Sequence, residues 1–247
     1  GLLIAASCGV AACDKQDEIA VDVASGAKCD ALAADPMDPN KVSPGVKDTD
    51  VNLKEAQAAC SVAARLDPGN ARIAFQFGRV LSLSGFARAA VDSYATAARK
   101  GYAIAAYYAG NIYQRGNGIE ADHEHAKAMY AIAYKGGFLL AGEALADAPG
   151  ARDDALPGAE KLYTDSANLG SMSAAHKLGK LFVSKRQSSR AIEWFDKAIE
   201  NGYVPAYAAK ADIYLTDSQD AASMEKALEL LRHGEEKNDP DAYYALW

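Results

Sequence analysis

The sequence predicts an all-α protein, a right-handed α-solenoid of about five to six helix-turn-helix repeats. Two observations support this prediction. Positions where Gly or Asn ends a helix follow one another at intervals of 36, 33, 32 and 36 residues. Small and aromatic residues recur around each of them at helical spacing, and no stretch shows the alternation typical of a strand. A single two-helix unit exposes too much apolar surface to be stable, so we expect the copies to stack.

The repeat is defined by its helix-ending residues, here called the anchors, which are Gly101, Gly137, Gly170, Gly202 and Asn238. Small residues lie eleven and four positions before each anchor, and the residue seven positions before it is Tyr, Phe or Leu. Another small residue lies nine positions after each of the first four anchors. Small residues let two helices approach closely, an aromatic ring fills the space beside them, and Gly or Asn caps the second helix.

The N-terminal stretch predicts export. Residues 1–13 are apolar, with small residues toward their end, and resemble the end of a secretory signal peptide. Residues 10–13, VAAC, also resemble a lipobox, which would make Cys13 the acylated residue of a bacterial lipoprotein. The alternative is a short ordered helix in which Cys8 and Cys13 are bonded to each other. Residues 14–28 are polar without a strong period and predict a tether.

Residues 29–68 predict an N-terminal helical hairpin. A short helix begins at Cys29, two Asp-Pro turns stop it, and a longer helix runs from about Asp50, its N-cap, to Leu66. Cys29 and Cys60 face each other if the two helices are antiparallel, which predicts a disulfide; the alternative is two buried free thiols. Four cysteines without a C-x-x-C spacing fit disulfides better than a zinc site, in agreement with export.

Residues 69–238 contain the regular repeats, and residues 239–247 predict a C-terminal capping helix. The least regular part is residues 139–172. Pro149 breaks the first helix of that unit early, and Pro157 stands near the first turn of the second. We therefore expect a shortened first helix in this unit.

Two of the copies resemble known repeat families. LKEAQAACSVAARLDPGN resembles a tetratricopeptide repeat, with Ala56 and Ala63 at its small positions, Pro68 at the turn and Cys60 in place of the aromatic residue. The copy at residues 101–138 resembles the Sel-like variant, whose longer turn G-x-G-[VI]-x-x-D is matched by GNGIEAD at 116–122. The resemblance covers roughly residues 50–247. It implies a protein-binding solenoid and identifies no ligand.

Composition and motifs exclude several functions. The net charge of −7 leaves no basic stripe for non-specific nucleic-acid binding. Nothing after residue 13 is long and apolar enough to cross a bilayer. We find no Walker loop, nucleophile elbow, H-E-x-x-H or dinucleotide glycine motif, and so expect no enzyme and no cofactor. His123 and His125 stand two residues apart, where helix side chains diverge, which predicts an exposed helix start rather than a metal site.

We expect partners to bind to the first helix of each hairpin, because tetratricopeptide-type arrays, which the sequence resembles, line a concave groove with that helix. Counting from the helix-ending residues selects Phe75, Arg79, Tyr107, Asn111, Gln114, His176, Lys180 and Asp212. Such aromatic, amide and basic groups suit an extended peptide or a partner helix, whose backbone the amides bond and whose apolar side chains the rings cover. The alternative for each position is packing between repeats.

Together these patterns predict a non-enzymatic scaffold or adaptor of the bacterial cell envelope. It would be periplasmic or lipid-anchored through Cys13 and would bind an envelope protein in its groove. One alternative is a structural subunit of a larger envelope complex, with the convex face of the solenoid or residues 239–247 as the interface. Another is implied by the resemblance to cysteine-bridged Sel-like proteins: a factor that binds cell-wall fragments or β-lactams.

Overall fold

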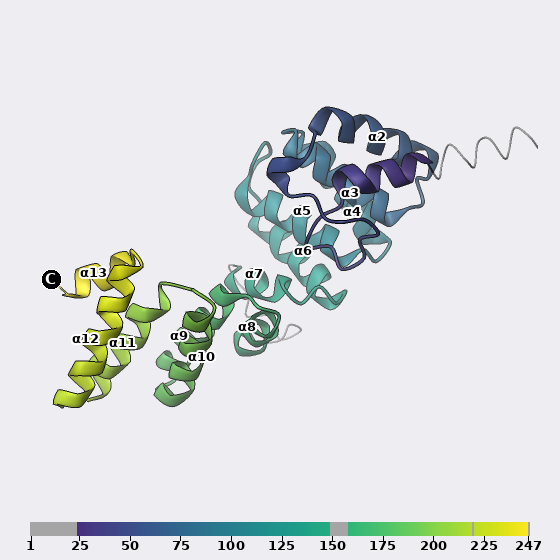
Figure 1. Ribbon diagram of the computed structural model, residues 1–247. Coiled ribbons are helices and arrows are strands. Elements are labelled where there is room, and N and C mark those ends of the chain that lie inside the picture. Colours follow the sequence, from purple (N-terminus) through teal and green to yellow (C-terminus); the bar gives the residue numbers. More distant parts are fainter. Residues whose placement is uncertain (1–23, 149–157, 219, 247) are drawn as a thin grey trace, which may run out of the picture. The chain divides into compact units, whose positions relative to one another are not determined.

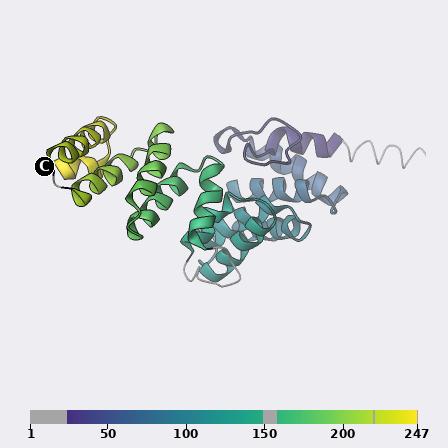
Figure 2. The same ribbon diagram turned by 90° about the horizontal axis from the view of Figure 1, so that it is seen from below.

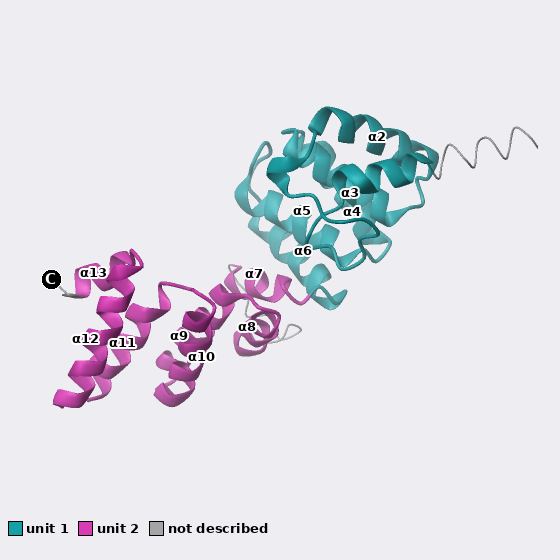
Figure 3. Ribbon diagram, in the orientation of Figure 1, with its two compact units in different colours: residues 1–138 teal, residues 139–247 magenta. Residues whose placement is uncertain are grey.

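The protein is all-helical wherever the structure, a computed structural model, describes it, namely over residues 24–148, 158–218 and 220–246. The predicted all-α fold class of repeated helical hairpins is therefore confirmed. The chain divides into two compact units, residues 1–138 and 139–247 (Figure 3). No helix of the described ranges is both long and apolar enough to cross a membrane. Cys8 and Cys13, and the predicted signal-type segment that holds them, lie outside these ranges.

Unit 1 opens with a helix at residues 24–33, followed by the 3-10 turn η1 (Asp48–Asp50) and α2 (Leu53–Leu66). Two hairpins come next, α3 (Ala71–Leu83) with α4 (Ala87–Arg99) and α5 (Ala103–Arg115) with α6 (His123–Lys135). Consecutive helices pack side by side, as Figures 1 and 2 show from two directions. Each hairpin therefore covers the apolar face of the preceding one.

Unit 2 repeats this plan with α7 (Ala141–Asp147), α8 (Ala159–Asn168), α9 (Met172–Ser184) and α10 (Ser188–Glu200). The elements α11 (Ala206–Asp217), α12 (Ala221–Glu236) and α13 (Pro240–Leu246) follow. The predicted short first helix is α7, which has 7 residues where α9 has 13. α13 packs on α12 and α11, in the place where the first helix of a further hairpin would lie.

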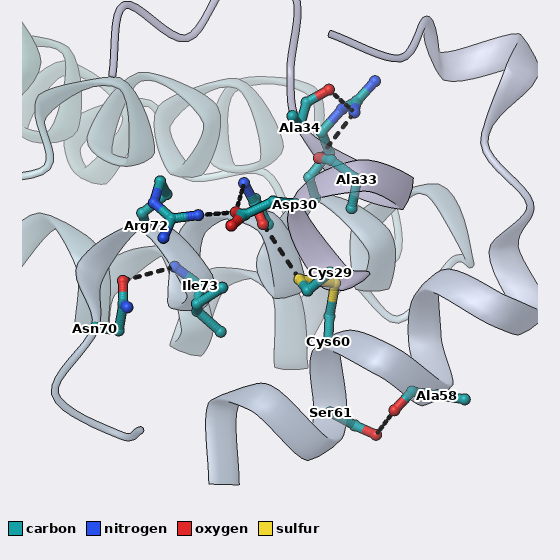
Figure 4. Close-up of a disulfide and its surroundings, with 12 residues drawn as sticks. Cys29, Asp30, Ala33, Ala34, Ala58, Cys60, Ser61, Asn70, Arg72 and Ile73 are labelled. Carbon is teal, nitrogen blue, oxygen red and sulfur yellow. Dashed lines mark hydrogen bonds and ion pairs between the residues drawn. A yellow bond between two sulfur atoms is a disulfide. The ribbon is translucent and has the colours of Figure 1, made fainter. Parts of the chain in front are cut away.

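The N-terminal hairpin differs from the prediction at two boundaries. Its first helix already includes residues 24–28, which were assigned to the tether. The N-cap of α2 is Asn52, whose side chain accepts a hydrogen bond from the backbone N–H of Glu55, and Asp50 belongs to η1. A disulfide joins Cys29 to Cys60 across the two helices, with their Cα atoms 4.7 Å apart (Figure 4).

The anchors adopt the left-handed conformation, as their role in the repeat requires. Gly101 has φ +83° and Asn238 has φ +62°, and the three anchors between them are also positive. The residue after each anchor donates its backbone N–H to the carbonyl five positions before it, as Tyr102 does to Ala97. This bond closes the last turn of the second helix and directs the chain into the next hairpin.

Aromatic rings of the second helices lie against glycines of the first helices. A Cβ added to Gly78 would lie 2.7 Å from the ring of Tyr94, and one added to Gly179 would lie 2.5 Å from the ring of Phe195. Both rings are fully buried. Each of these two hairpins is thus held by a ring that occupies the space left by a missing side chain, which brings the two helix backbones close together.

Candidate functional site

In unit 1 the chain binds a segment of itself. We call residues 29–50 the covering segment. It lies on a surface of α3 and the start of α5 that we call the α3/α5 face, made of Arg72, Gln76, Arg79, Tyr102 and Tyr108. Four aspartates of the covering segment contact this face, each through its carboxylate: Asp30, Asp35, Asp38 and Asp48. Cys29 fixes the beginning of the segment to α2.

Arg79 is the centre of the contact. Its side chain is 2% exposed, and its Nη1 donates to the carbonyl oxygens of Ala33 and Ala34, each at 3.1 Å. Nη2 donates to the carbonyl oxygen of Val46 at 2.6 Å and to the carboxylate of Asp48 at 2.5 Å. Nε lies 3.3 Å from the carboxylate of Asp35. One guanidinium thus holds two stretches of the covering segment, residues 33–35 and 46–48, because its planar fork presents five donors.

Two tyrosine hydroxyls bind the buried aspartates. Tyr102 donates to Asp38 at 2.6 Å, and Tyr108 donates to Asp35 at 2.5 Å. Burial raises the pKa of both tyrosines well above the ordinary value, and the neighbouring carboxylates raise it further. Both hydroxyls therefore stay protonated, and each supplies a donor that its carboxylate needs away from water.

Asp30 completes the contact near the disulfide. Its carboxylate accepts a hydrogen bond from Gln76 Nε2 at 2.9 Å and pairs with the guanidinium of Arg72 (Figure 4). Asp30 is buried, and Arg72 is partly exposed. The α3/α5 face thus holds carboxylates at both ends of the covering segment.

Phe75 and Arg79 differ from their predicted role in an open groove. Phe75 is 0% exposed, with its ring 5.4 Å from that of Tyr102 and 5.6 Å from that of Tyr108. The covering segment buries Arg79. Both positions are on the predicted helix face, but the chain's own N-terminal part occupies the space that a partner would need.

The three predicted positions on α5 are partly exposed. The ring of Tyr107 lies 5.2 Å from that of Phe138 and 5.9 Å from that of Tyr130. Asn111 accepts a hydrogen bond from the Tyr130 hydroxyl at 2.9 Å, and the carbonyl oxygen of Gln114 lies 3.3 Å from His123 Nδ1. Tyr107 and Asn111 therefore also serve packing between helices.

Unit 2 contains a counterpart of the α3/α5 face, 101 residues further along the chain. Gly78 and Gly179 are that far apart, as are Gly101 and Gly202. By the same shift, Phe75 corresponds to His176. The His176 ring lies 5.6 Å from that of Phe195 and 5.3 Å from that of Tyr203, as Phe75 lies 5.8 Å from Tyr94 and 5.4 Å from Tyr102. The two units thus build the same aromatic framework.

We call the counterpart surface, made of His176, Lys180, Tyr203 and Asp212, the α9/α11 face. Lys180 corresponds to Arg79 and is exposed, as is Asp212, which corresponds to Asn111. In the described part of the chain, neither side chain forms a hydrogen bond or ion pair. Burial lowers the pKa of His176, and the charges of Lys180 and Lys177 lower it further. Of the three predicted residues of unit 2, Lys180 and Asp212 are therefore exposed and His176 is half-buried.

The two histidines at the start of α6 contact different partners. His123 contacts Gln114, whereas His125 Nδ1 lies 2.7 Å from the carboxylate of Asp122, the N-cap of the helix. Both are exposed. Among the described residues, no group of three or more His, Cys, Asp or Glu side chains is arranged to hold a metal ion.

Sequence reasoning missed most of the residues that bind the covering segment. Tyr102 directly follows the anchor Gly101, and Tyr108 directly follows the predicted groove residue Tyr107. Their places in the repeat could therefore have marked both tyrosines as candidates. Asp35 and Asp38 stand in the two Asp-Pro turns. These turns indicate a loop but do not indicate which helices the loop contacts. No sequence pattern shows that a loop returns to a helix more than 30 residues away.

Comparison with known proteins gives the fold. No family model matches the sequence, and no curated protein matches it. Among solved structures, the protective antigen c5321 of uropathogenic Escherichia coli, which displays an SLR fold, aligns with a TM-score of 0.66 and 22% identity over 78% of this chain. This chain spans 43% of the length of c5321.

Two further structures cover more of their own chains. A Sel1 repeat protein from Oxalobacter formigenes aligns with a TM-score of 0.57 and 18% identity, over 89% of this chain and 87% of that one. The TPR protein YrrB, described as having an unusual peptide-binding site, aligns with a TM-score of 0.57 and 19% identity, over 77% of this chain and 98% of that one. The protein therefore has the helical-hairpin fold of Sel-like and tetratricopeptide-type repeat proteins, as the sequence predicted.

Proposed function

We propose that this protein is a non-enzymatic interaction scaffold of the bacterial cell envelope that binds an extended peptide or a partner helix on the α9/α11 face. One observation carries the proposal: the matching face of unit 1 already binds another stretch of polypeptide, the largely irregular covering segment. Arg79 and the two tyrosines hold that stretch through its backbone carbonyls and carboxylates. In unit 2 the same framework presents the exposed Lys180 beside the half-buried rings of Tyr203 and His176.

The chemistry of the α9/α11 face suits a polypeptide partner. Lys180 offers a mobile cation to carbonyl or carboxylate oxygens, and Asp212 offers an acceptor to backbone N–H groups or a basic side chain. The half-buried rings of His176 and Tyr203 offer an apolar surface between them. The partly exposed Tyr107, Asn111 and Gln114 of unit 1 belong to the proposal as a second set of contacts, and the buried Phe75 and Arg79 do not.

The envelope location is a separate part of the proposal. The Cys29–Cys60 disulfide supports it, because such bonds persist mainly in oxidising compartments. Intact mass of the protein purified from its native host tests it. Export is supported if the mass shows the disulfide together with either the loss of the apolar segment by cleavage or the added acyl groups on Cys13. Free thiols at both positions in freshly lysed cells would contradict it.

Site-specific photo-crosslinking tests the binding surface. A benzophenone amino acid replaces Ala209, the counterpart of Tyr108, and in a control protein it replaces Glu193, which is exposed on α10. We expect a discrete adduct with an envelope protein from the probe at 209, greatly reduced by Lys180→Glu, and none from the probe at 193. The same adducts from both probes, or no adduct from the probe at 209, would overturn the assignment of this face.

A further inference from the structure

Unit 1 contains a cavity that the covering segment leaves open. Its volume is about 420 Å³, within the range of small-molecule sites. It lies between the C-terminal halves of α3 and α5, with Asp48 of the covering segment on one side and Asn117 and Gly118 of the Sel-like turn on another. The cavity is thus bordered by the longer turn that distinguishes this copy from its neighbours.

One wall of the cavity carries a buried hydroxyl without a partner. Tyr94 lines the cavity and is 0% exposed, and its hydroxyl oxygen forms no hydrogen bond with the described part of the chain. A buried polar group without a hydrogen-bond partner lowers the stability of the folded state, and native structures contain few such groups. Burial raises the pKa of Tyr94 well above its ordinary value, so the hydroxyl stays protonated and available as a donor.

Two more donors line the same cavity. Arg115 is exposed at its mouth and has no hydrogen bond or ion pair with the described residues. Asn111 uses its carbonyl oxygen for the Tyr130 hydroxyl, which leaves its amide N–H groups free to donate. Arg79 and Asp48, which also line the cavity, already satisfy each other. Arg115 is therefore the one charged group of the lining that is left unpaired by the described residues, and the Tyr94 hydroxyl and the Asn111 amide add hydrogen-bond donors beside it.

The cavity also has apolar walls. Leu83 and Ile112 contribute aliphatic surface, and Tyr94 and Tyr108 contribute rings. Donors and a guanidinium favour an anion, and a carboxylate is the anion whose two oxygens match an Arg fork and neighbouring hydroxyl and amide groups. The rings and aliphatic side chains favour an apolar body attached to it.

We propose that this cavity binds a small organic carboxylate with an apolar body, held by Arg115, Asn111 and the Tyr94 hydroxyl. This site is separate from the α9/α11 face and does not depend on the scaffold function. The same chemistry is present in a free small acid and in the terminal carboxylate of a peptide that ends in an apolar residue.

Isothermal titration of the full chain with phenylacetate tests the site, with phenylacetamide as the uncharged control. We expect saturable binding of phenylacetate and at least about tenfold weaker binding of the amide, since the hydrogen bonds to charged groups are lost. Arg115→Gln is expected to weaken phenylacetate binding about tenfold or more, and Arg99→Gln, which changes an exposed arginine away from the cavity, is expected to leave it unchanged.

Tyr94→Phe separates a binding role from a structural one. It should weaken phenylacetate binding severalfold while leaving the Tm of the unliganded protein unchanged or higher, because it removes a buried hydroxyl that has no partner.

Acetyl-Gly-Gly-Phe, with a free or amidated C-terminus, distinguishes the two ligand sources. Binding of the peptide acid but not of phenylacetate would identify a polypeptide terminus. No saturable binding of either acid, or affinities unaffected by Arg115→Gln and Tyr94→Phe, would overturn the proposal.

Discussion

Arg79→Met tests whether the covering segment is held on unit 1 by one buried guanidinium. The substitution keeps the apolar stem and removes every donor. Asp35, only 2% exposed, would lose its cationic neighbour, and three backbone carbonyls would lose a donor. Removing one partner of a buried ion pair typically costs about 3–5 kcal/mol, because the other charge stays buried without compensation. We therefore expect unit 1 to lose about 3–5 kcal/mol of unfolding free energy.

Lys180→Met is the matched control, because Lys180 is the counterpart of Arg79 and is exposed. Its effect should stay within about 0.5 kcal/mol. Repeat arrays need not unfold in one step, so urea unfolding should be combined with hydrogen exchange of peptides from residues 34–48 and 172–184. We expect faster exchange in the first peptide only. A loss below about 1 kcal/mol, the value of an exposed ion pair, or equal losses in both variants, would refute this account of Arg79.

Three further predictions concern the disulfide, the close helix contact at Gly179 and the buried side of His176. Replacing both Cys29 and Cys60 by Ser should lower the unfolding free energy by about 3.7 kcal/mol by the chain-entropy relation, for a sequence separation of 31, as measured by urea unfolding. Gly179→Ala should cost about 1–3 kcal/mol, because the added Cβ would lie 2.5 Å from the facing phenylalanine ring; thermal unfolding measures it. The lowered pKa of His176 means that the folded state disfavours its protonation, so unit 2 should lose stability as pH falls from about 6.5 through the lower folded pKa. His176→Phe, which copies unit 1, should remove that part of the pH dependence in Tm measurements between pH 7.5 and 5.

Each of these predictions has its own control. A reducing agent should destabilise the parent protein and leave the double Ser variant unchanged; equal effects on both would exclude the disulfide as the cause. Gly26→Ala makes the same chemical change in a helix where the added Cβ meets nothing within 4 Å, and it should stabilise by about 0.5–1 kcal/mol. Equal effects at Gly26 and Gly179 would contradict close packing at the latter. An unchanged pH profile in His176→Phe would show that another group causes it.

The binding of unit 1 to its own chain bears on how the array functions. The covering segment shows that α3 and α5 can hold a largely irregular stretch of polypeptide through side chains on the first helices. It also removes that surface from use by a partner, so the partner surfaces that we propose are the exposed positions of α5 and the α9/α11 face. Because residues 101 positions apart correspond in the two units, each residue of the α9/α11 face can be compared with its counterpart on the α3/α5 face.

The sequence by itself determined the repeated architecture. Gly or Asn at the anchors, small residues beside them and an aromatic seven positions earlier are local requirements of helix capping and close helix packing. They can be recognised without knowing which helices touch. The helical hairpin within residues 101–138, the short α7 and the placement of His123 and His125 at a solvated helix start follow from the same local reasoning.

Only the tertiary structure decided which parts of the first-helix surfaces are free. Arg79 and Lys180 occupy equivalent positions and were predicted to play equivalent parts, yet one is buried under residues 29–50 and the other is exposed. The difference comes from a segment whose Asp-Pro turns specify its local path but not the helices on which it lies. Its position depends on contacts over 31 to 73 positions of sequence, from Arg79 with Asp48 to Tyr108 with Asp35, and no local pattern encodes contacts at that distance.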